Sequence, residues 1–473
     1  MSPSEWVPIR WSSGPVDIAM RKNVSSDEKE ALSACHEPAA LRILEGSPFN
    51  CLVISLAAGV AEDEAQKSTL KPLVDAAKAK GLAVLGRVTG KAVFSATQAA
   101  ELGLAGIVTD TELLTASGAD SGITLVREPD WPSVRMGQGG NADAGPTGAP
   151  WIDSNGWKVQ LARALNPAAT VWTTGEPKRR GEPGGGAPMR PDQYALAVAD
   201  AGAYGGRWVV ALDPITQAGL LKGSGEAREA WSTLTRAVKF FDAQKDWNKL
   251  GIMSRIGVVS DFTGPNEFLA LEYLNLSTRR LLPARIIHSA KLTPESWHGL
   301  RALVVIGGDA DRQLLIQYLT NGGMVILPPG KLADAAKRLP AAGTHENGYQ
   351  LYQAEKGMVA VSPEEWTDPY MVAQDAHRLL GRKNDVVRLW NSGSTIAYPT
   401  ANGPRTVVHL VNYTGRPSNQ LMTLYVVRPH AQARMIDLAG KVEVLKAERK
   451  NEGTEVALPV FTSYAAVEFG DKA

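Results

Sequence analysis

Carboxylates and indoles gather near the ends of short apolar segments in the first half of this chain. Four carboxylates stand at such places: Asp110, Glu128, Asp153 and Glu176. A pair of carboxyl groups, one protonated and one ionised, is the machinery that breaks a glycosidic bond. Neighbouring indoles suit the same chemistry, because the C–H faces of a pyranose are apolar while its hydroxyls need hydrogen bonds.

Histidine and cysteine are scarce in the same region. His36 is the only histidine before residue 248, and it lies in an expected helix. This disfavours a histidine-ligated metal and a Ser-His-Asp triad. Cys35 and Cys51 do not have zinc-ligand spacing. They suit two buried thiols, with a disulfide between them as the alternative. We therefore expect no metal and no cofactor at the site.

The elements that must position these residues alternate short strands with helices from residue 1 to 248. Eight strand–helix units within about 240 residues match the size of a (β/α)8 TIM barrel. Near-continuous apolar strands are typical of a parallel sheet with both faces covered. Expected helices are 64–80, 96–102, 158–165, 192–204 and 226–244, and expected strands are 7–10, 51–56, 82–88, 105–109, 123–127, 150–153, 170–173 and 207–212.

Active sites of TIM barrels form at the carboxyl ends of the strands. Those ends would bring the four carboxylates together, and Arg87 follows the third strand. Two Gly/Pro-rich loops, 137–149 and 178–191, are expected on the same rim. The candidate substrate-binding residues there are Arg10, Trp11, Trp131, Trp151, Asn155, Trp157, Trp172 and Asp213.

Each candidate also has a structural interpretation. Asp110 and the segment Trp151–Trp157 can cap the helices that follow them. Asp213 precedes a proline and is typical of a turn. Glu128 can form an ion pair at the rim, and Arg10 can pair with a structural carboxylate inside the barrel. These alternatives stay open at the level of sequence.

The pattern changes twice after the first half. Residues 249–385 again alternate strands (255–261, 284–288, 303–309, 324–327) with helices (266–282, 312–321), which predicts a flavodoxin-like α/β domain. From residue 386 to 473 the period becomes two, which predicts an antiparallel β-sandwich. Its expected strands are 395–399, 406–412, 421–427, 433–437, 441–447, 454–458 and 464–469.

The three parts together resemble bacterial glycoside hydrolases of the trimerising β-galactosidase type. In that family a catalytic barrel precedes an amidotransferase-like domain and a small β domain. The local matches are Ala302–Asp309 and Val408–Tyr413, and the resemblance covers nearly the whole chain. It implies an acid/base after the fourth strand and a nucleophile after the seventh, at Asp110 and Glu176.

This chain departs from the family pattern at the fourth strand. The family has Asn-Glu where this chain has Thr109-Asp110. An aspartate is one methylene shorter than a glutamate, so its reach differs. Glu128 and Asp153 are therefore the next candidates, and an inverting pair with a wider separation is an alternative to a retaining one.

The resemblance also implies that the middle domain is not catalytic. An active amidotransferase needs a cysteine on a tight strand-to-helix turn, and residues 249–385 contain none. Packing and oligomerisation are the expected functions, with a dimer or trimer as the assembly. There are two alternatives to an active glycoside hydrolase. One is a degenerate barrel that binds carbohydrate or acts as a scaffold, and the other is a different barrel enzyme, such as a lyase or a metal-dependent hydrolase that uses Mg²⁺ or Ca²⁺.

Composition excludes other classes. The chain has 50 basic and 49 acidic residues, which argues against a general nucleic-acid binder. It contains no run of about 18 apolar residues, the length of a membrane span, and no signal-peptide pattern. We expect a soluble protein with a carbohydrate partner and without nucleic-acid or membrane partners. A periplasmic or secreted location would require a leader ahead of this sequence.

Overall fold

The computed structural model describes residues 2–21, 24–134, 151–176, 189–307 and 310–470. The chain divides into two compact units. The first combines Met1–Ser133 with Asp153–Lys245, and the second combines Val134–Ile152 with Asp246–Ala473. Loop 137–149 and most of loop 178–191 lie outside the described residues.

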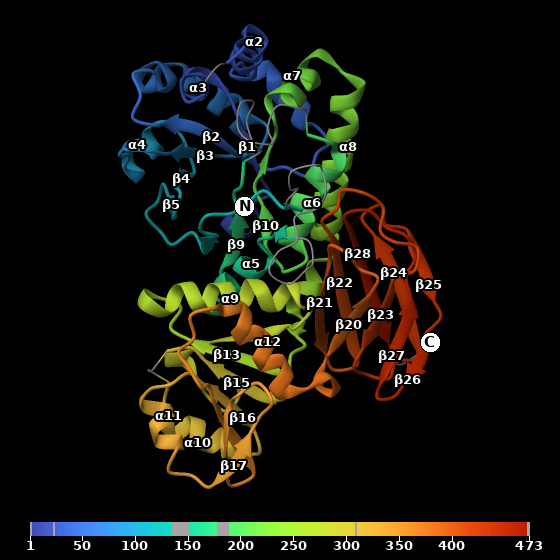
Figure 1. Ribbon diagram of the computed structural model, residues 1–473. Helices are drawn as coiled ribbons and strands as arrows, with labels where there is room; N and C mark the ends of the chain where they lie inside the picture. Colours follow the sequence, from blue (N-terminus) through green and yellow to red (C-terminus); the bar gives the residue numbers. More distant parts are fainter. Residues whose placement is uncertain (1, 22–23, 135–150, 177–188, 308–309, 471–473) are drawn as a thin grey trace. The chain divides into compact units, whose positions relative to one another are not determined.

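Parallel strands form the centre of the first unit (Figure 1). One sheet has the order β11-β1-β2-β3-β4-β5 and another has the order β10-β9-β6. All pairs are parallel except β4 with β5. The bounds are β1 (Pro8–Trp11), β2 (Cys51–Ala57), β3 (Ala83–Val88), β4 (Gly106–Val108), β5 (Leu113–Thr115), β6 (Ile123–Leu125), β9 (Thr170–Thr173), β10 (Arg207–Trp208) and β11 (Val210–Ala211).

Helices alternate with these strands and have recognisable end signals. Ser25 and Ser95 each form a capping box, with Glu28 and Gln98 respectively. Gly223 ends one helix in the left-handed conformation. The bounds are α1 (Gly14–Ala19), α2 (Ser26–Cys35), α3 (Asp63–Ala79), α4 (Ala96–Glu101), α5 (Gly156–Leu165), α6 (Pro191–Gly202), α7 (Pro214–Lys222) and α8 (Gly225–Ala243).

The expected closed eight-stranded barrel is not found among the described residues. The expected strand at 150–153 is present only as β8 (Ile152–Asp153), outside both parallel sheets; β7 (Ser133–Val134) is the strand before it in the chain. After β4 the chain forms a hairpin to β5 instead of a helix. The Thr109 hydroxyl accepts from the backbone N–H groups of Thr111 and Glu112, 3.2 and 3.0 Å away. This turn replaces the expected helix start.

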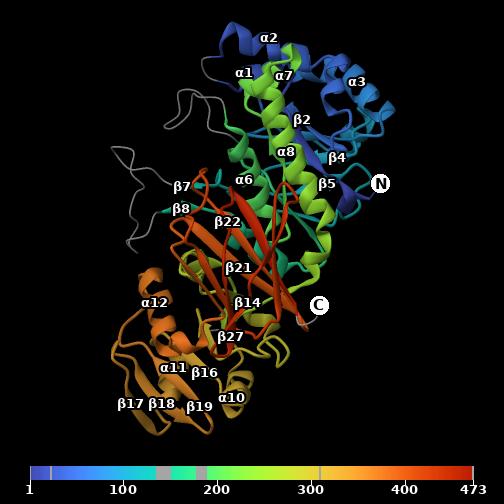
Figure 2. The ribbon, with the colours of Figure 1, turned by 90° about the vertical axis from the view of Figure 1, so that its right-hand side faces the viewer.

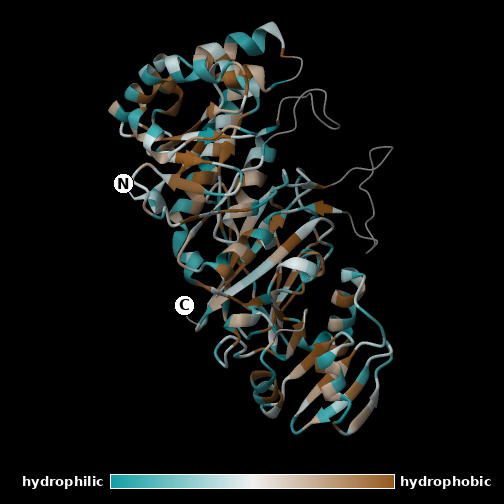
Figure 3. Ribbon diagram, turned by 90° about the vertical axis from the view of Figure 1, so that its left-hand side faces the viewer, coloured by the Kyte–Doolittle hydropathy of each residue, from teal (hydrophilic) through white to brown (hydrophobic). Residues whose placement is uncertain are grey.

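Both sheets of the first unit nevertheless share one hydrophobic core. The Val209 N–H, between β10 and β11, donates to the Thr173 carbonyl at 2.7 Å and so joins the two sheets. Figure 3 shows hydrophobic stretches along these strands. The cluster draws on both sheets through Trp6, Cys51, Val53, Leu85, Val108, Leu113, Ile123, Leu125, Trp172 and Val209. The carboxyl ends of the parallel strands therefore surround the same end of this core.

The two cysteines are buried thiols without a disulfide. Burial raises the pKa of the Cys35 thiol to about 12 and raises the pKa of Cys51 as well. Both thiols are thus protonated at neutral pH and behave as small apolar side chains.

The middle of the chain forms a seven-stranded sheet with the order β14-β13-β15-β16-β19-β18-β17 (Figure 2). The first five strands are parallel, in the order that flavodoxin-like sheets have. The strands are β13 (Ile256–Ser260), β14 (Ala284–His288), β15 (Ala302–Val305), β16 (Met324–Leu327), β17 (Ala341–Thr344), β18 (Gln350–Ala354) and β19 (Gly357–Val361); the helices are α9 (Glu267–Arg279), α10 (Arg312–Thr320), α11 (Lys331–Ala336) and α12 (Pro369–Leu380).

The C-terminal part consists of two antiparallel sheets that pack around one shared core. Alternate residues such as Leu424 and Val426 of one sheet and Val408 and Leu410 of the other lie in that core. The sheets have the orders β12-β21-β22-β28-β24-β25 and β20-β23-β27-β26. Their strands are β12 (Gly251–Ile252), β20 (Val387–Trp390), β21 (Thr395–Asn402), β22 (Arg405–Asn412), β23 (Thr423–Val426), β24 (Gln432–Asp437), β25 (Val442–Leu445), β26 (Glu448–Lys450), β27 (Gly453–Ala457) and β28 (Tyr464–Gly470).

Candidate functional site

A pocket lies at the carboxyl ends of the parallel strands of the first unit. Its enclosed space measures about 20 Å³, enough for about one water molecule. Apolar side chains from β2, β4, β9 and the β10–β11 segment line its floor. The polar lining residues are Arg10, Arg87, Thr109, Asp110, Thr174 and Glu176, and the apolar ones are Val53, Val108, Trp172, Val209 and Ala211.

Glu176 is the centre of the charge arrangement in this pocket. Arg87 Nη1 donates to Glu176 Oε1 at 2.5 Å, and Arg10 Nη1 lies 3.3 Å from the same oxygen. The Glu176 side chain is 28% exposed and lines the pocket, and two guanidiniums contact its carboxylate. Opposite charges at this distance favour the ionised form of a carboxylate.

Asp110 approaches the same guanidinium from the other side. Its Oδ1 lies 3.6 Å from Arg87 Nη2, and its side chain is 69% exposed. One arginine therefore bridges the two carboxylates that the family resemblance singles out. The strand ends bring Asp110 and Glu176 together, and the turn at Thr109 leaves Asp110 at the rim instead of capping a helix.

Arg10 forms the buried side of the site. It is 8% exposed, and its Nη2 donates to Asp17 Oδ1 at 3.1 Å and to Ser55 Oγ at 3.0 Å. Arg10 lines the pocket and also pairs with the buried carboxylate of Asp17. Asp17 follows β1 on α1, and Ser55 interrupts the apolar run of β2.

Trp11, Trp157 and Trp172 are buried. Trp11 points away from the pocket, and its Nε1 donates to the Cys35 carbonyl at 2.8 Å. It alternates with Arg10 along β1, and so faces the helix layer. Trp157 is packed on α5 and is 7% exposed. Trp172 lines the pocket floor but is fully buried, with its ring 6.4 Å from that of Trp6, so it offers no open face to a sugar ring.

The other two indoles occupy different environments. The Trp131 ring packs edge-on against Trp208 at 5.3 Å and Tyr194 at 6.1 Å, in the first unit. Trp151 belongs to the second unit, where Arg279 stacks over its ring at 3.7 Å. Neither is among the residues that line the pocket. The structure therefore does not assemble the predicted indoles into one sugar platform.

Asn155, Glu128 and Asp153 also lie outside the pocket lining. The Asn155 side chain accepts from the Asp130 N–H and donates to Asp200 Oδ2, both at 2.8 Å. It thus ties a loop to α6 and is fully buried. Glu128 is exposed with a positive φ of 44°. Asp153 lies on the short strand β8.

Asp213 is a helix cap. It is 6% exposed and accepts from the backbone N–H groups of Ile215 and Thr216 at the start of α7. The hydroxyls of Tyr194 and Thr216 also donate to it, each at 2.6 Å. Asp213 therefore caps α7, where the sequence indicated a turn, and it does not line the pocket.

Replacing Asp213 by alanine should lower the stability of the protein, because Asp213 caps a helix and does not line the pocket. The change leaves several buried hydrogen-bond donors without an acceptor, so we expect the free energy of unfolding to fall by about 2–4 kcal/mol. That corresponds to a fall of roughly 5–10 °C in the unfolding midpoint of a unit of this size, measured by differential scanning fluorimetry. Asp242→Ala is the control, because the Asp242 side chain is exposed and its ion pair with Arg207 is long, at 3.8 Å. An equal fall in both variants would contradict the capping assignment.

The residues that sequence reasoning undervalued are those that support the carboxylates. Arg87 and Asp17 stand next to strand ends, but neither appeared among the candidate catalytic or substrate-binding residues. The signal for Ser55 is a hydroxyl within the apolar run Cys51–Ala57. A lone polar residue in a buried strand needs a hydrogen-bond partner, which points to a polar network.

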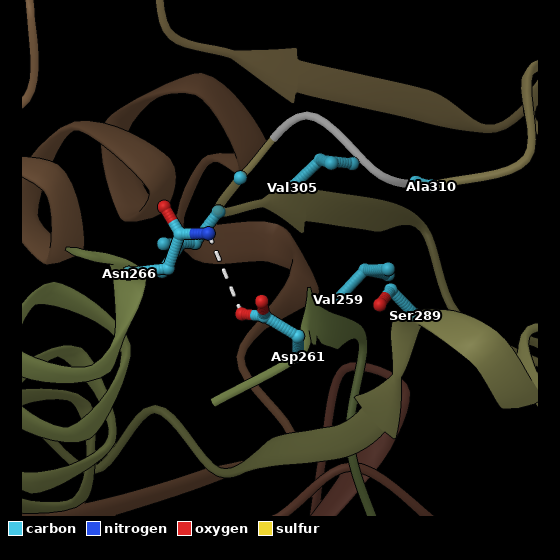
Figure 4. A pocket seen from close by; sticks show the side chains of 8 residues that line it. Val259, Asp261, Asn266, Ser289, Val305 and Ala310 are labelled. Atoms are coloured by element: carbon cyan, nitrogen blue, oxygen red, sulfur yellow. Dashed lines mark hydrogen bonds between the residues drawn. The ribbon is translucent and has the colours of Figure 1, made fainter. Parts of the chain in front are cut away.

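A second, smaller pocket lies at the carboxyl ends of β13 and β15 in the second unit (Figure 4). Asn266 Nδ2 donates to Asp261 Oδ1 at 3.4 Å, and Ser289 is the other polar side chain in the lining. The chain's two cysteines lie in the first unit. This pocket therefore lacks the cysteine nucleophile of an amidotransferase.

Two negative findings concern the described residues as a whole. Among them, no three His, Cys, Asp or Glu side chains are grouped so as to hold a metal ion. The helices that the structure describes include none with the length and apolar character needed to cross a bilayer.

Solved structures of three glycosidases are among those that resemble this chain. α-L-Fucosidase isoenzyme 2 from Paenibacillus thiaminolyticus matches with a TM-score of 0.57 and 11% identity, over 99% of this chain and 100% of that one. A β-galactosidase from Bacillus circulans sp. alkalophilus gives 0.46 and 9%, over 87% and 68%. A GH42 β-galactosidase catalytic mutant from G. stearothermophilus gives 0.45 and 8%, over 99% and 98%. No protein-family model and no curated protein sequence matches the chain.

Proposed function

We propose that this protein is a glycoside hydrolase whose reaction takes place at the mouth of the pocket between Glu176 and Asp110. The observation that supports this most directly is the shared guanidinium: Arg87 lies 2.5 Å from Glu176 and 3.6 Å from Asp110. Two carboxylates brought together at strand ends, in a fold found in glycoside hydrolases, have the chemistry that glycosidic cleavage requires.

The environments of the two carboxylates suit different roles. Glu176 contacts two arginines, which suits a carboxylate that acts in its charged form, as nucleophile or as base. Asp110 contacts Arg87 at a longer distance and is mostly exposed. By the family resemblance, Asp110 stands where the acid/base is expected, after the fourth strand. Asp110 is therefore the proton donor in this proposal.

The size of the pocket determines where the sugar sits. An enclosed space of about 20 Å³ is far too small for a pyranose ring. The ring therefore rests at the mouth, over Arg87 and between the two carboxylates, and the enclosed space holds at most a water molecule. Neither carboxylate has to move into the core for this arrangement.

A panel of 4-nitrophenyl glycosides, with α- and β-linked neutral and acidic sugars, tests the proposal. We expect turnover of at least one member, and loss of that turnover when the two carboxylates are replaced. Saturable binding without turnover, measured by calorimetry across the same sugars and natural oligosaccharides, would instead establish the degenerate, carbohydrate-binding alternative.

The second unit has no catalytic role in this proposal. By the family resemblance it mediates self-association into a dimer or trimer, and its C-terminal sheets form a β-sandwich. Light scattering coupled to size-exclusion chromatography measures the assembly, and a monomeric mass at micromolar concentration would remove this part of the proposal.

A further inference from the structure

The Arg10 guanidinium contacts two carboxylates, those of Asp17 and Glu176. On one side, Nη2 donates to Asp17 Oδ1 at 3.1 Å and to Ser55 Oγ at 3.0 Å. On the other side, Nη1 lies 3.3 Å from Glu176 Oε1. Arg10 and Asp17 are 8% and 5% exposed, so this arrangement is shielded from water. Low exposure strengthens the electrostatic interactions within it.

The two sides of Arg10 differ in kind. The contacts with Asp17 and Ser55 have hydrogen-bond geometry, whereas the contact with Glu176 is an ion pair without it. Among the described residues, Arg10 Nη1 and Nε have no hydrogen-bond acceptor. Arg87 does donate a hydrogen bond to Glu176, at 2.5 Å. Arg10 therefore supplies charge to Glu176 without a directed hydrogen bond.

Both carboxylate oxygens of Asp17 accept further hydrogen bonds. The Ser13 N–H donates to Oδ2, and the Ser55 hydroxyl donates to Oδ1, each at 2.8 Å. The turn into α1 depends on Gly14, whose φ is +79° and whose added Cβ would lie 2.6 Å from His36 Nδ1. Asp17 does not line the pocket and so reaches the site only through Arg10.

We propose that Asp17 is a positioning residue that holds Arg10 back from Glu176, so that the guanidinium stabilises the carboxylate's charge without forming a hydrogen bond to it. This rests on the proposed function in one respect, namely that Glu176 reacts. A carboxylate that donates electrons to a sugar carbon must stay ionised, yet each strong hydrogen bond to it reduces its reactivity. Asp17 competes with Glu176 for the Arg10 guanidinium, and so limits how strongly Arg10 binds the Glu176 carboxylate.

The consequence of losing Asp17 has a definite sign. Asp17→Asn removes a negative charge beside Arg10, so Arg10 pairs more closely with Glu176. Stronger pairing favours the ionised carboxylate, which then titrates at lower pH. Among the residues that the structure describes, Arg87 and Asp110 also line the pocket beside Glu176, and this substitution leaves both of them unchanged. His36, behind Ser13, has a pKa lowered by burial and stays neutral near pH 7, so it contributes no competing charge.

The test is a carbon-13 NMR titration of the Glu176 carboxyl in protein labelled at glutamate, with Glu176→Gln to assign the signal. We expect the titration midpoint to fall by at least half a pH unit in Asp17→Asn, and to fall less in Ser55→Ala, which removes one acceptor from Arg10 without changing charge. Asp63→Asn is the matched control. Like Asp17, Asp63 is an aspartate whose carboxylate accepts backbone hydrogen bonds, here from the N–H groups of Ala58 and Gly59, but it lies outside the pocket lining.

An unchanged or higher midpoint in folded Asp17→Asn and Ser55→Ala would overturn the inference. So would an equal fall in the Asp63 control, because that would indicate a general loss of structure. On an aryl glycoside that the wild type cleaves, the acid limb of kcat/KM should move to lower pH while kcat falls about 10-fold and KM changes little. Absence of wild-type turnover would count against the proposed function alone, because the NMR titration needs no substrate.

Discussion

Replacing Glu176 with glutamine is expected to lower kcat by about 1,000-fold or more on any glycoside that the protein cleaves. Glutamine keeps the size of the side chain but cannot act as an anionic nucleophile or base. The variant also leaves Arg10 and Arg87, which lie 3.3 and 2.5 Å from the carboxylate, without that partner. The measurement is initial-rate kinetics on the best substrate of the panel, for protein whose unfolding midpoint has been checked.

The control for this variant is Glu112→Gln. Glu112 follows β4 in the turn formed by Thr109, is exposed, and is not among the residues that line the pocket. Its activity should remain within a factor of two of the wild type. If Glu176→Gln retained more than a tenth of the activity, Glu176 would have no chemical role, and Glu128 and Asp153 would become the candidates to test next.

The strands were predictable because they have strong local signals. Buried parallel strands are near-continuous apolar runs that end at glycines or capping residues, as Cys51–Ala57 and Ala83–Val88 do. The middle sheet was predictable for the same reason: Ala284–His288 and Met324–Leu327 have the expected bounds. Among the candidate catalytic residues, Asp110 and Glu176 come together because each follows a strand of this kind.

Other features depend on contacts that the local sequence does not record. The Thr109 hydroxyl and the backbone bond from Thr109 N–H to the Glu112 carbonyl hold a hairpin turn where the alternation of strand and helix predicts a helix. Trp11 next to Arg10 suggests a sugar platform, yet alternation along β1 points the indole towards the Cys35 carbonyl. Arg10 also contacts both Asp17, which is near it in the chain, and Glu176, which is far from it. Spacing alone cannot show such a contact.

Replacing Asp110 with asparagine should have an effect that depends on the leaving group. In the proposed function Asp110 donates a proton to the departing oxygen, a contribution of about 100- to 10,000-fold. The loss should approach that size on an alkyl glycoside or a disaccharide, whose leaving groups need protonation. It should be much smaller on a 2,4-dinitrophenyl glycoside, because that phenolate departs without a proton. The measurement is kcat/KM for the two substrate types, with the same sugar in both.

The leaving-group dependence separates proton donation from simpler roles. Asp110 Oδ1 lies 3.6 Å from Arg87 and its side chain is 69% exposed, so its removal leaves no buried charge behind and should cost little stability. The control is Asp120→Asn, in the turn that follows β5. The side-chain hydrogen bond described for Asp120 is a local one, from the Gly122 N–H. Equal losses on both substrate types would show that Asp110 positions the sugar or Arg87, and the proton would then have to come from another group at the mouth of the pocket.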